Sequence, residues 1–210
     1  MTTWNNAQSL RDSRKRAGAP YAQGKCVARK DTTALLEAVI RPGDRVCLEG
    51  DNQKQADLLA TALAAVNKDK VHDLHMVQSG VVLPEHLDLF ELGIAKRLDY
   101  AYSGPQSQRI AKLLFGGKIE LGAVHTYLEL FARYYVDLTP QVALIAAVSA
   151  DREGNLYTGP NTEDTPAIVE ATAFKDGIVI AQVNEIVDKL PRVDIPGDWV
   201  DFVIDRKSVV

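Results

Sequence analysis

A continuous apolar segment at residues 142–148 is followed by a polar turn that contains Gly154 and Gly159. A short run of this kind, rich in Val, Ile and Ala and bounded by turn residues, is typical of a strand buried on both faces of a parallel sheet. Open sheets of that class bind ligands at the carboxyl ends of their strands. Residues 150–164, which follow the predicted strand, are therefore the first place to look for function.

Along the rest of the chain, short apolar runs alternate with segments of helical spacing, which predicts a repeating βα fold. We expect strands at residues 45–48, 74–77, 97–102, 142–148 and 200–204. We expect helices at residues 32–40, 54–66, 84–93, 106–115, 127–135 and from about 162 onwards. The predicted fold class is α/β, an open and mostly parallel sheet flanked by helices.

Local signals refine two of these helices. Asp31 precedes the helix at 32–40 and can cap it through its side chain. In the helix at 127–135, the apolar spacing puts Tyr127, Phe131 and Tyr135 on one face, which we expect to lie in the core or at an interface.

Composition places the chain among ordinary globular proteins, with 46% hydrophobic and 25% charged residues among 210. The net charge of -4 gives no case for nucleic acid as the main partner. No run of about 18 apolar residues occurs, so no membrane span is expected. Cys26 and Cys47 have neither metal-site spacing nor the number of a disulfide framework, which fits a reduced, cytoplasmic setting.

The basic residues are concentrated at the start of the chain. Residues 1–30 contain seven Lys and Arg residues and a single Asp. We interpret residues 1–30 as an arm that packs on a neighbouring chain, with a disordered tail as the alternative. Residues 31–210 then form the main domain.

Four loops are expected at the carboxyl edge of the predicted sheet, at residues 49–53, 78–80, 103–105 and 150–161. Glycines let a ligand approach the backbone, and the helix starts that follow favour anionic groups such as a carboxylate. For each loop taken singly, a simple turn is the alternative. The candidate substrate-binding residues are Gly50, Asp51, Asn52, Gln53, Ser79, Gly80, Ser103, Gly104, Asn155 and Asn161.

The titratable residues suggest little chemistry of their own. Glu49 ends a predicted strand at this edge and is the candidate nucleophile within the chain, although a solvated carboxylate is the commoner case. His72 and His75 fall on opposite faces of a strand, so we predict no metal site. His86 is expected on an exposed helix turn. His125 is expected to be a structural cap or a partly buried ring.

The pattern V-A-L-I-x-x-V-S-x-x-D-x-x-G-N at residues 142–155, with the closing segment at 177–201, resembles the first domain of the coenzyme A transferase superfamily. Within that superfamily, residues 118–139 are most similar to the alpha subunit of malonate decarboxylase. The resemblance covers about residues 30–205 and implies a coenzyme A transferase-like sheet, with a strand at 177–187 in its closing segment.

The resemblance also implies an activity, the exchange of acetyl for malonate on an acyl carrier protein. The partners would be that carrier protein, malonate, acetate and the other malonate decarboxylase subunits, in an oligomer. No cofactor would bind directly, because the acyl group travels on the carrier's phosphopantetheine-type arm. Gly50 stands alone where many members carry several glycines, which favours a carrier arm over free coenzyme A.

In this superfamily the nucleophile is a glutamate on a second domain, and no segment of this chain resembles that domain. The catalytic residue is therefore expected outside the chain, which we interpret as the first domain of a longer two-domain subunit. Alternatives are a citrate lyase alpha-type or acetate coenzyme A-transferase domain, and a scaffold domain without chemistry. Preference for a carrier protein over free coenzyme A would separate the transferases. A sugar-phosphate isomerase would need cations in the four loops, where only Arg152 occurs.

Overall fold

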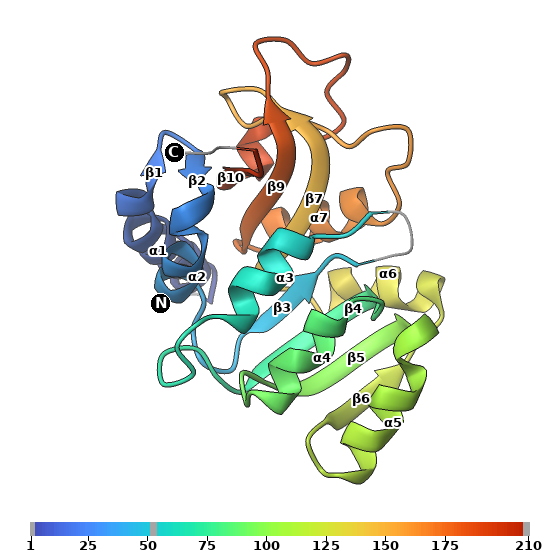
Figure 1. Cartoon of the computed structure of the whole chain (residues 1–210). Coiled ribbons are helices and arrows are strands. Elements are labelled where there is room, and N and C mark those ends of the chain that lie inside the picture. Colours follow the sequence, from blue (N-terminus) through green and yellow to red (C-terminus); the bar gives the residue numbers. More distant parts are fainter. Residues whose placement is uncertain (1–2, 51–53, 208–210) are drawn as a thin grey trace.

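A ten-stranded sheet runs through the middle of the structure, a computed structural model that describes residues 3–50 and 54–207 (Figure 1). The strands follow the order β1-β2-β10-β9-β7-β3-β4-β5-β6, and β8 pairs with β7. All described pairs are parallel except β1 with β2 and β7 with β8. The strands are β1 (Ala22–Gln23), β2 (Cys26–Ala28), β3 (Arg45–Leu48), β4 (Leu74–Gly80), β5 (Ala95–Tyr102), β6 (Glu120–Val124), β7 (Val142–Ala150), β8 (Leu156–Tyr157), β9 (Ile178–Ile186) and β10 (Phe202–Asp205).

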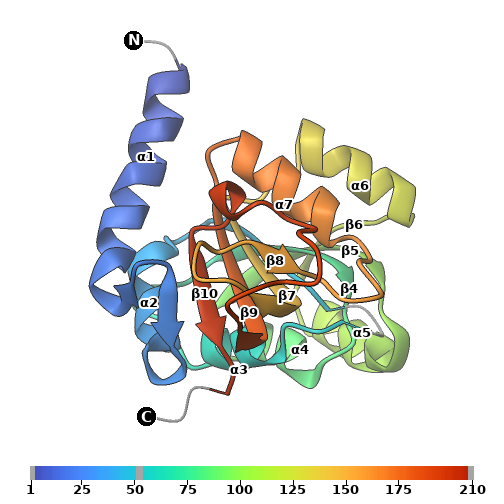
Figure 2. The ribbon, with the colours of Figure 1, turned by 90° about the horizontal axis from the view of Figure 1, so that it is seen from above.

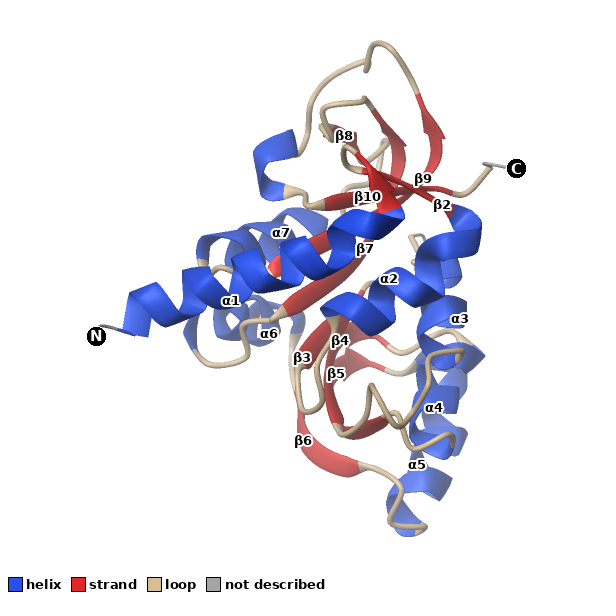
Figure 3. Ribbon diagram, turned by 90° about the vertical axis from the view of Figure 1, so that its left-hand side faces the viewer, coloured by secondary structure: helices blue, strands red, loops and turns tan. Residues whose placement is uncertain are grey.

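Helices cover both faces of this sheet and give the molecule three layers. The helices are α1 (Thr3–Gly18), α2 (Thr32–Val39), α3 (Asp57–Ala64), α4 (Pro84–Glu91), α5 (Ser107–Phe115), α6 (Tyr127–Val136) and α7 (Thr165–Phe174). Short 3-10 turns occupy Ala19–Tyr21, Arg29–Asp31, Gly104–Gln106 and Gly197–Trp199. Helices α6 and α7 lie on one face, and α2 to α5 lie on the other (Figures 2 and 3). The predicted fold class is confirmed, and no described helix is long and apolar enough to cross a membrane.

Strand β7 joins the two apolar cores. Leu144 and Ala146 belong to the core under α2 to α5, whereas Ala143 and Ile145 belong to the core under α6 and α7. Because successive strand residues point to opposite faces, a strand covered on both sides needs an unbroken apolar run. The prediction for residues 142–148 is therefore confirmed.

The basic start of the chain is an ordered helix with internal partners. Arg14 of α1 is buried, and its two terminal nitrogens donate to Asp44 Oδ2 at 2.5 Å and Oδ1 at 2.8 Å. Arg11 donates to Asp201 Oδ1 at 2.9 Å. The alternative of a disordered tail is wrong for residues 3–18, which form a helix with ion pairs inside the chain. That this arm also packs on a neighbouring chain stays a prediction.

Some predicted boundaries were wrong because tertiary pairing overrides turn signals. Gln78 and Gly80 continue β4, since they pair with Tyr100 and Tyr102 of β5. Helix α3 begins at Asp57, not at residue 54, because Gln55 forms a bridge to Gly50. The edge strand β6 was missed.

The side-chain prediction for Asp31 was wrong, and the core side of α6 differs from the face that we singled out, whose place at an interface stays a prediction. Asp31 makes no side-chain capping hydrogen bond to α2. In α6, Leu130 and Tyr134 are the buried residues, whereas Tyr127 is 45% and Tyr135 40% exposed. Both sets have helical spacing, so periodicity could not decide which one faces the sheet.

The Arg14 ion pair yields a prediction. Arg14→Ala leaves Asp44 as a buried charge without its guanidinium, so we expect the free energy of unfolding to fall by about 3 kcal/mol. Arg16→Ala, at an exposed position of the same helix, should change it by less than about 0.5 kcal/mol. Urea unfolding followed by circular dichroism measures both, and equal effects would contradict a role for the buried pair.

Candidate functional site

A cavity of about 480 Å³ lies at the carboxyl ends of β7 and β9. Its wall also includes the segment that leads into α3, the loop after β8 and the turn after β10. The lining is mostly polar and carries both signs of charge. The lining residues are Lys54, Gln55, Asp57, Ala146, Ala147, Val148, Thr158, Pro160, Asn161, Gln182, Asn184 and Arg206.

Glu49 lies directly behind this wall, and its side chain is completely buried. Strand β3 ends at Leu48, whereas β7 continues beyond it, so the backbone N–H of Ala146 lacks a strand partner there. Glu49 Oε2 accepts this N–H at 2.6 Å and replaces the missing carbonyl. The solvated carboxylate that we considered for Glu49 is therefore wrong.

The other carboxylate oxygen of Glu49 faces α7 and Lys54. The Thr165 hydroxyl donates to Oε1, and Lys54 Nζ lies 3.4 Å from the same atom. Burial raises the pKa of Glu49 to about 7, since the charge of Lys54 offsets desolvation only in part and Asp164 adds repulsion. The carboxyl group therefore titrates near neutral pH.

Lys54 joins the two sides of the cavity. Its ammonium group donates to the carbonyl of Thr162 at 3.2 Å and to the hydroxyl of Thr165. A Lys54–Thr165–Glu49 chain of contacts thus ties the segment before α3 to the start of α7. Sequence reasoning missed this lysine, because only the fold brings residues 54 and 165 together.

Gln182 of β9 holds the start of α3. The first turn of a helix has unpaired N–H groups, and no side chain of Ala56 is available to cap them. Gln182 Oε1 accepts the N–H of Leu59 at 3.0 Å, and its Nε2 donates to Asp57 Oδ1 at 2.8 Å. A lone amide within the apolar run of residues 178–183 was the sequence signal for this role.

The packing around position 50 explains why the residue there is a glycine. A Cβ atom at this position would lie 2.1 Å from Cε1 of His86, so glycine makes room for that ring. His86 is fully buried, and the prediction of an exposed helix turn is wrong. Ser79 and Gly80 are buried at the end of β4 beside this contact. Asp51, Asn52 and Gln53 lie outside the described residues.

The remaining predicted residues fall in different places. Asn161 lines the cavity. Asn155 accepts the N–H of Gly197 at 2.7 Å and donates to Asp151 at 2.7 Å, so its amide holds the loop after β7. Ser103 and Gly104 lie at the end of β5. Among the described members of the predicted set, Asn161 alone is in the cavity wall.

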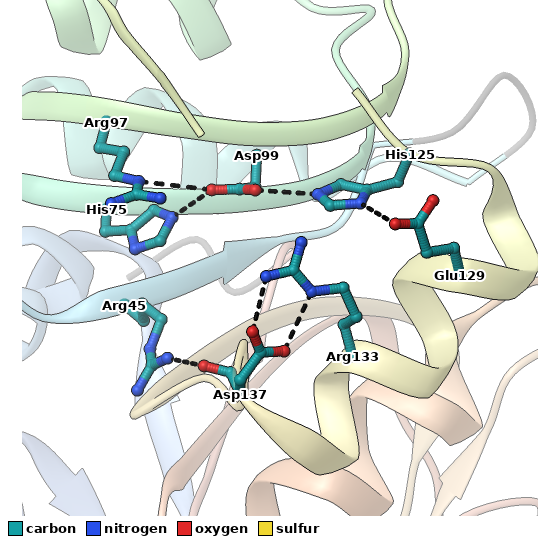
Figure 4. A network of polar contacts seen from close by, with 8 residues as sticks. All are labelled: Arg45, His75, Arg97, Asp99, His125, Glu129, Arg133 and Asp137. Carbon is teal, nitrogen blue, oxygen red and sulfur yellow. Dashed lines mark hydrogen bonds and ion pairs between the residues drawn. The ribbon is translucent and has the colours of Figure 1, made fainter. Parts of the chain in front are cut away.

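A separate polar cluster surrounds Asp99 on the α6 face of the sheet (Figure 4). Asp99 is buried, and its two oxygens lie 2.7 Å from His75 Nε2 and 2.8 Å from His125 Nε2. Glu129 of α6 lies 3.4 Å from His125 Nδ1. The two histidine contacts lower the pKa of Asp99, against the effect of its burial. His125 is fully buried, whereas we expected a structural cap or a partly buried ring; the cap of α6 is Thr126.

This Asp99 cluster shares no residue with the cavity wall, and it packs α6 onto the sheet. Within residues 3–50 and 54–207, no three His, Cys, Asp or Glu residues are arranged to hold a metal ion.

Comparison with known proteins identifies the family. The sequence profile for "Malonate decarboxylase, alpha subunit, transporter" matches residues 3–210. The chain belongs to the malonate decarboxylase alpha subunit family. An acetyl-S-ACP:malonate ACP transferase from Malonomonas rubra is 62% identical over 185 residues, which are 88% of this chain and 33% of that protein. The chain thus spans about a third of this curated relative.

Solved structures of malonate decarboxylases agree closely with this one. A Pseudomonas malonate decarboxylase hetero-tetramer in complex with malonate matches 99% of this chain and 38% of its own, with 58% identity and a TM-score of 0.96. The alpha subunit from Acinetobacter baumannii matches 97% of this chain and 38% of its own, with 51% identity and a TM-score of 0.95.

A more distant structure establishes the fold alone. Glutaconate coenzyme A-transferase from Acidaminococcus fermentans is 17% identical, with a TM-score of 0.68 over 86% of this chain and 75% of its own. The resemblances to the coenzyme A transferase fold and to the malonate decarboxylase alpha subunit family are both confirmed.

The burial of Glu49 predicts an unusual pH dependence of stability. Below pH 4.5 the carboxyl group is protonated in both states; between there and pH 7 it ionises only in the unfolded chain. Raising the pH through this range should therefore destabilise the fold by about 3 kcal/mol.

In Glu49→Gln the unfolding free energy should no longer fall between pH 4.5 and 7. In Glu153→Gln, a change at an exposed loop position, it should fall as in the wild type. Denaturant unfolding at a series of pH values measures the difference. Parallel pH profiles for the wild type and Glu49→Gln would contradict the raised pKa.

Because Gly122 packs against Asp99, we predict that Gly122 does not tolerate a larger side chain. A Cβ atom on Gly122 would lie 1.8 Å from Asp99 Oδ2, so Gly122→Ala should cost about 2–3 kcal/mol of unfolding free energy. In an Asp99→Ala background the same change should cost much less, because the clash is gone. A double-mutant cycle by thermal or urea unfolding tests this. If Gly122→Ala lowers the unfolding free energy equally in both backgrounds, the clash with Asp99 is not the cause.

Proposed function

We propose that this chain forms the substrate-lining part of an acyl carrier protein transferase. In that reaction acetyl-carrier protein and malonate give malonyl-carrier protein and acetate, so one thioester replaces another. The observation that carries the proposal is the 62% identity to the Malonomonas rubra transferase of that activity. The cavity at the carboxyl edge of the sheet supports it, since open α/β sheets bind ligands there.

The chemistry of the cavity wall suits a small anionic acid. Lys54 and Arg206 bring positive charge, and Asn161 and Asn184 bring amide groups. The start of α3 adds the positive end of a helix dipole. At about 480 Å³ the cavity lies within the usual range for small-molecule sites.

In this proposal Glu49 is a positioning residue. It is fully buried and absent from the cavity wall, and its oxygens are taken up by Ala146, Thr165 and Lys54. A nucleophile has to reach the acyl carbon, which this arrangement prevents. The glutamate nucleophile that the superfamily resemblance implies would therefore lie outside this chain, on a second domain.

The proposal includes the partners as well. These are the acyl carrier protein with its prosthetic arm, and the other malonate decarboxylase subunits in a cytoplasmic oligomer. The Pseudomonas hetero-tetramer, which holds malonate, supports such an assembly. No cofactor would bind to this chain directly. Of the predicted contacts, Asn161 is the first to test; Gly50, Ser79 and Gly80 would shape the neighbouring strand ends.

An exchange assay tests the proposed function. The assembled enzyme is given acetyl-carrier protein and labelled malonate, and label should appear on the carrier as acetate is released. Free acetyl coenzyme A should replace the acetylated carrier poorly. Failure to label the carrier would contradict the transferase, and equal use of coenzyme A would favour a coenzyme A-transferase.

Lys54→Met should lower this exchange by roughly 10-fold or more, because it removes a charged donor from the cavity wall. Lys175→Met, at an exposed position after α7, is the matched control and should retain full activity. Unchanged activity in Lys54→Met would argue against this cavity as the substrate site.

A further inference from the structure

Two cationic side chains line the cavity, and their surroundings differ. Lys54 already donates to Thr162 and Thr165 and lies against Glu49. Its side chain is only 10% exposed. Lys54 therefore holds the two sides of the cavity wall together, and its ammonium group already has three protein partners.

Arg206 is in a different position. Its side chain is 45% exposed, and among the described residues its guanidinium is paired with Asp57 alone, through one nitrogen at 2.5 Å from Oδ2. A guanidinium has five N–H donors in a planar fork that matches a carboxylate. Most of these donors are therefore available to a ligand in the cavity that Arg206 lines.

Contacts of the Arg206 backbone and of its partner Asp57 restrain the arginine. Its backbone N–H donates to the carbonyl of Val183 at 2.9 Å, which continues the pairing of β10 with β9. Asp57, its partner, is itself fixed by Gln182 at 2.8 Å, and Gln182 is buried. Such a supported arginine loses little freedom when it binds an anion.

The acceptor acid in the proposed reaction needs such a group. Malonate has two carboxylates, and only one becomes the thioester. The other keeps its charge throughout, and moving a charge from water into a cavity without a partner is costly. Acetate, which leaves in the same reaction, has no second carboxylate.

We infer that Arg206, oriented by Asp57 and Gln182, binds the carboxylate of malonate that does not react and so selects a dicarboxylic acid over acetate. This inference rests on the proposed function. It assigns the specificity of the cavity to the turn after β10 and the start of α3, and it gives Lys54 and Glu49 no part in that choice.

The test compares two acids in the assembled enzyme with acetyl-carrier protein. Labelled malonate reports transfer to the dicarboxylate, and labelled acetate reports the corresponding exchange without a second carboxylate. Arg206→Ala should lower kcat/KM for malonate on the order of 100-fold, mainly through KM. Exchange of acetate should stay within about threefold of the wild type, which also shows that the variant is folded.

Two further variants sharpen the result. Arg206→Lys should recover part of the malonate exchange, because it keeps the charge but loses the fork. Arg152→Ala, whose side chain is 81% exposed and outside the cavity wall, should behave as the wild type.

Equal losses for both acids, or no loss for malonate, would overturn the inference while the wild-type exchange still upholds the proposed function. A wild-type enzyme that exchanges neither acid would overturn the proposed function, and this inference with it.

Discussion

The parallel pairing of β7 with β3 on one side and β9 on the other is the constraint on which the rest of the structure depends. It sets the two apolar cores on opposite faces of one strand and brings the carboxyl ends of β7 and β9 together. Because β7 continues beyond the end of β3, the N–H of Ala146 needs another acceptor on that side, and Glu49 supplies one. The buried carboxyl group is thus a consequence of how the strands end.

That consequence organises the cavity. A carboxyl group buried behind the wall requires compensation, which Lys54 and Thr165 provide, and these contacts in turn fix the segments on either side. Elsewhere in the cavity wall, the Gln182 side chain caps the start of α3 by accepting the N–H of Leu59. The same amide donates to Asp57 and so orients it. Polar groups that complete the backbone hydrogen bonding of the fold therefore also place the charges of the site.

Sequence reasoning could predict the layers of this fold but not its buried polar contacts. The apolar run at 142–148 favoured a strand covered on both faces, and this local signal was sufficient. The exposure of Glu49 depended on α7, which begins 116 residues beyond it in the chain. The pairing of Arg14 with Asp44 likewise joins residues 30 positions apart, and the basic composition of the segment pointed to an arm on a neighbouring chain instead. Gly50 was read as a ligand contact because its true neighbour, His86, could be found only in three dimensions.

The protonation state of the Glu49 carboxyl group is the most direct test of how the cavity wall is built. Its carbon can be labelled with ¹³C and its chemical shift followed by NMR as the pH is raised, with Glu49→Gln identifying the signal. The structure predicts a midpoint at about 7, well above the ordinary 4.5 of a glutamate. A midpoint near 4.5 would contradict a buried carboxyl group whose charge its neighbours compensate only in part.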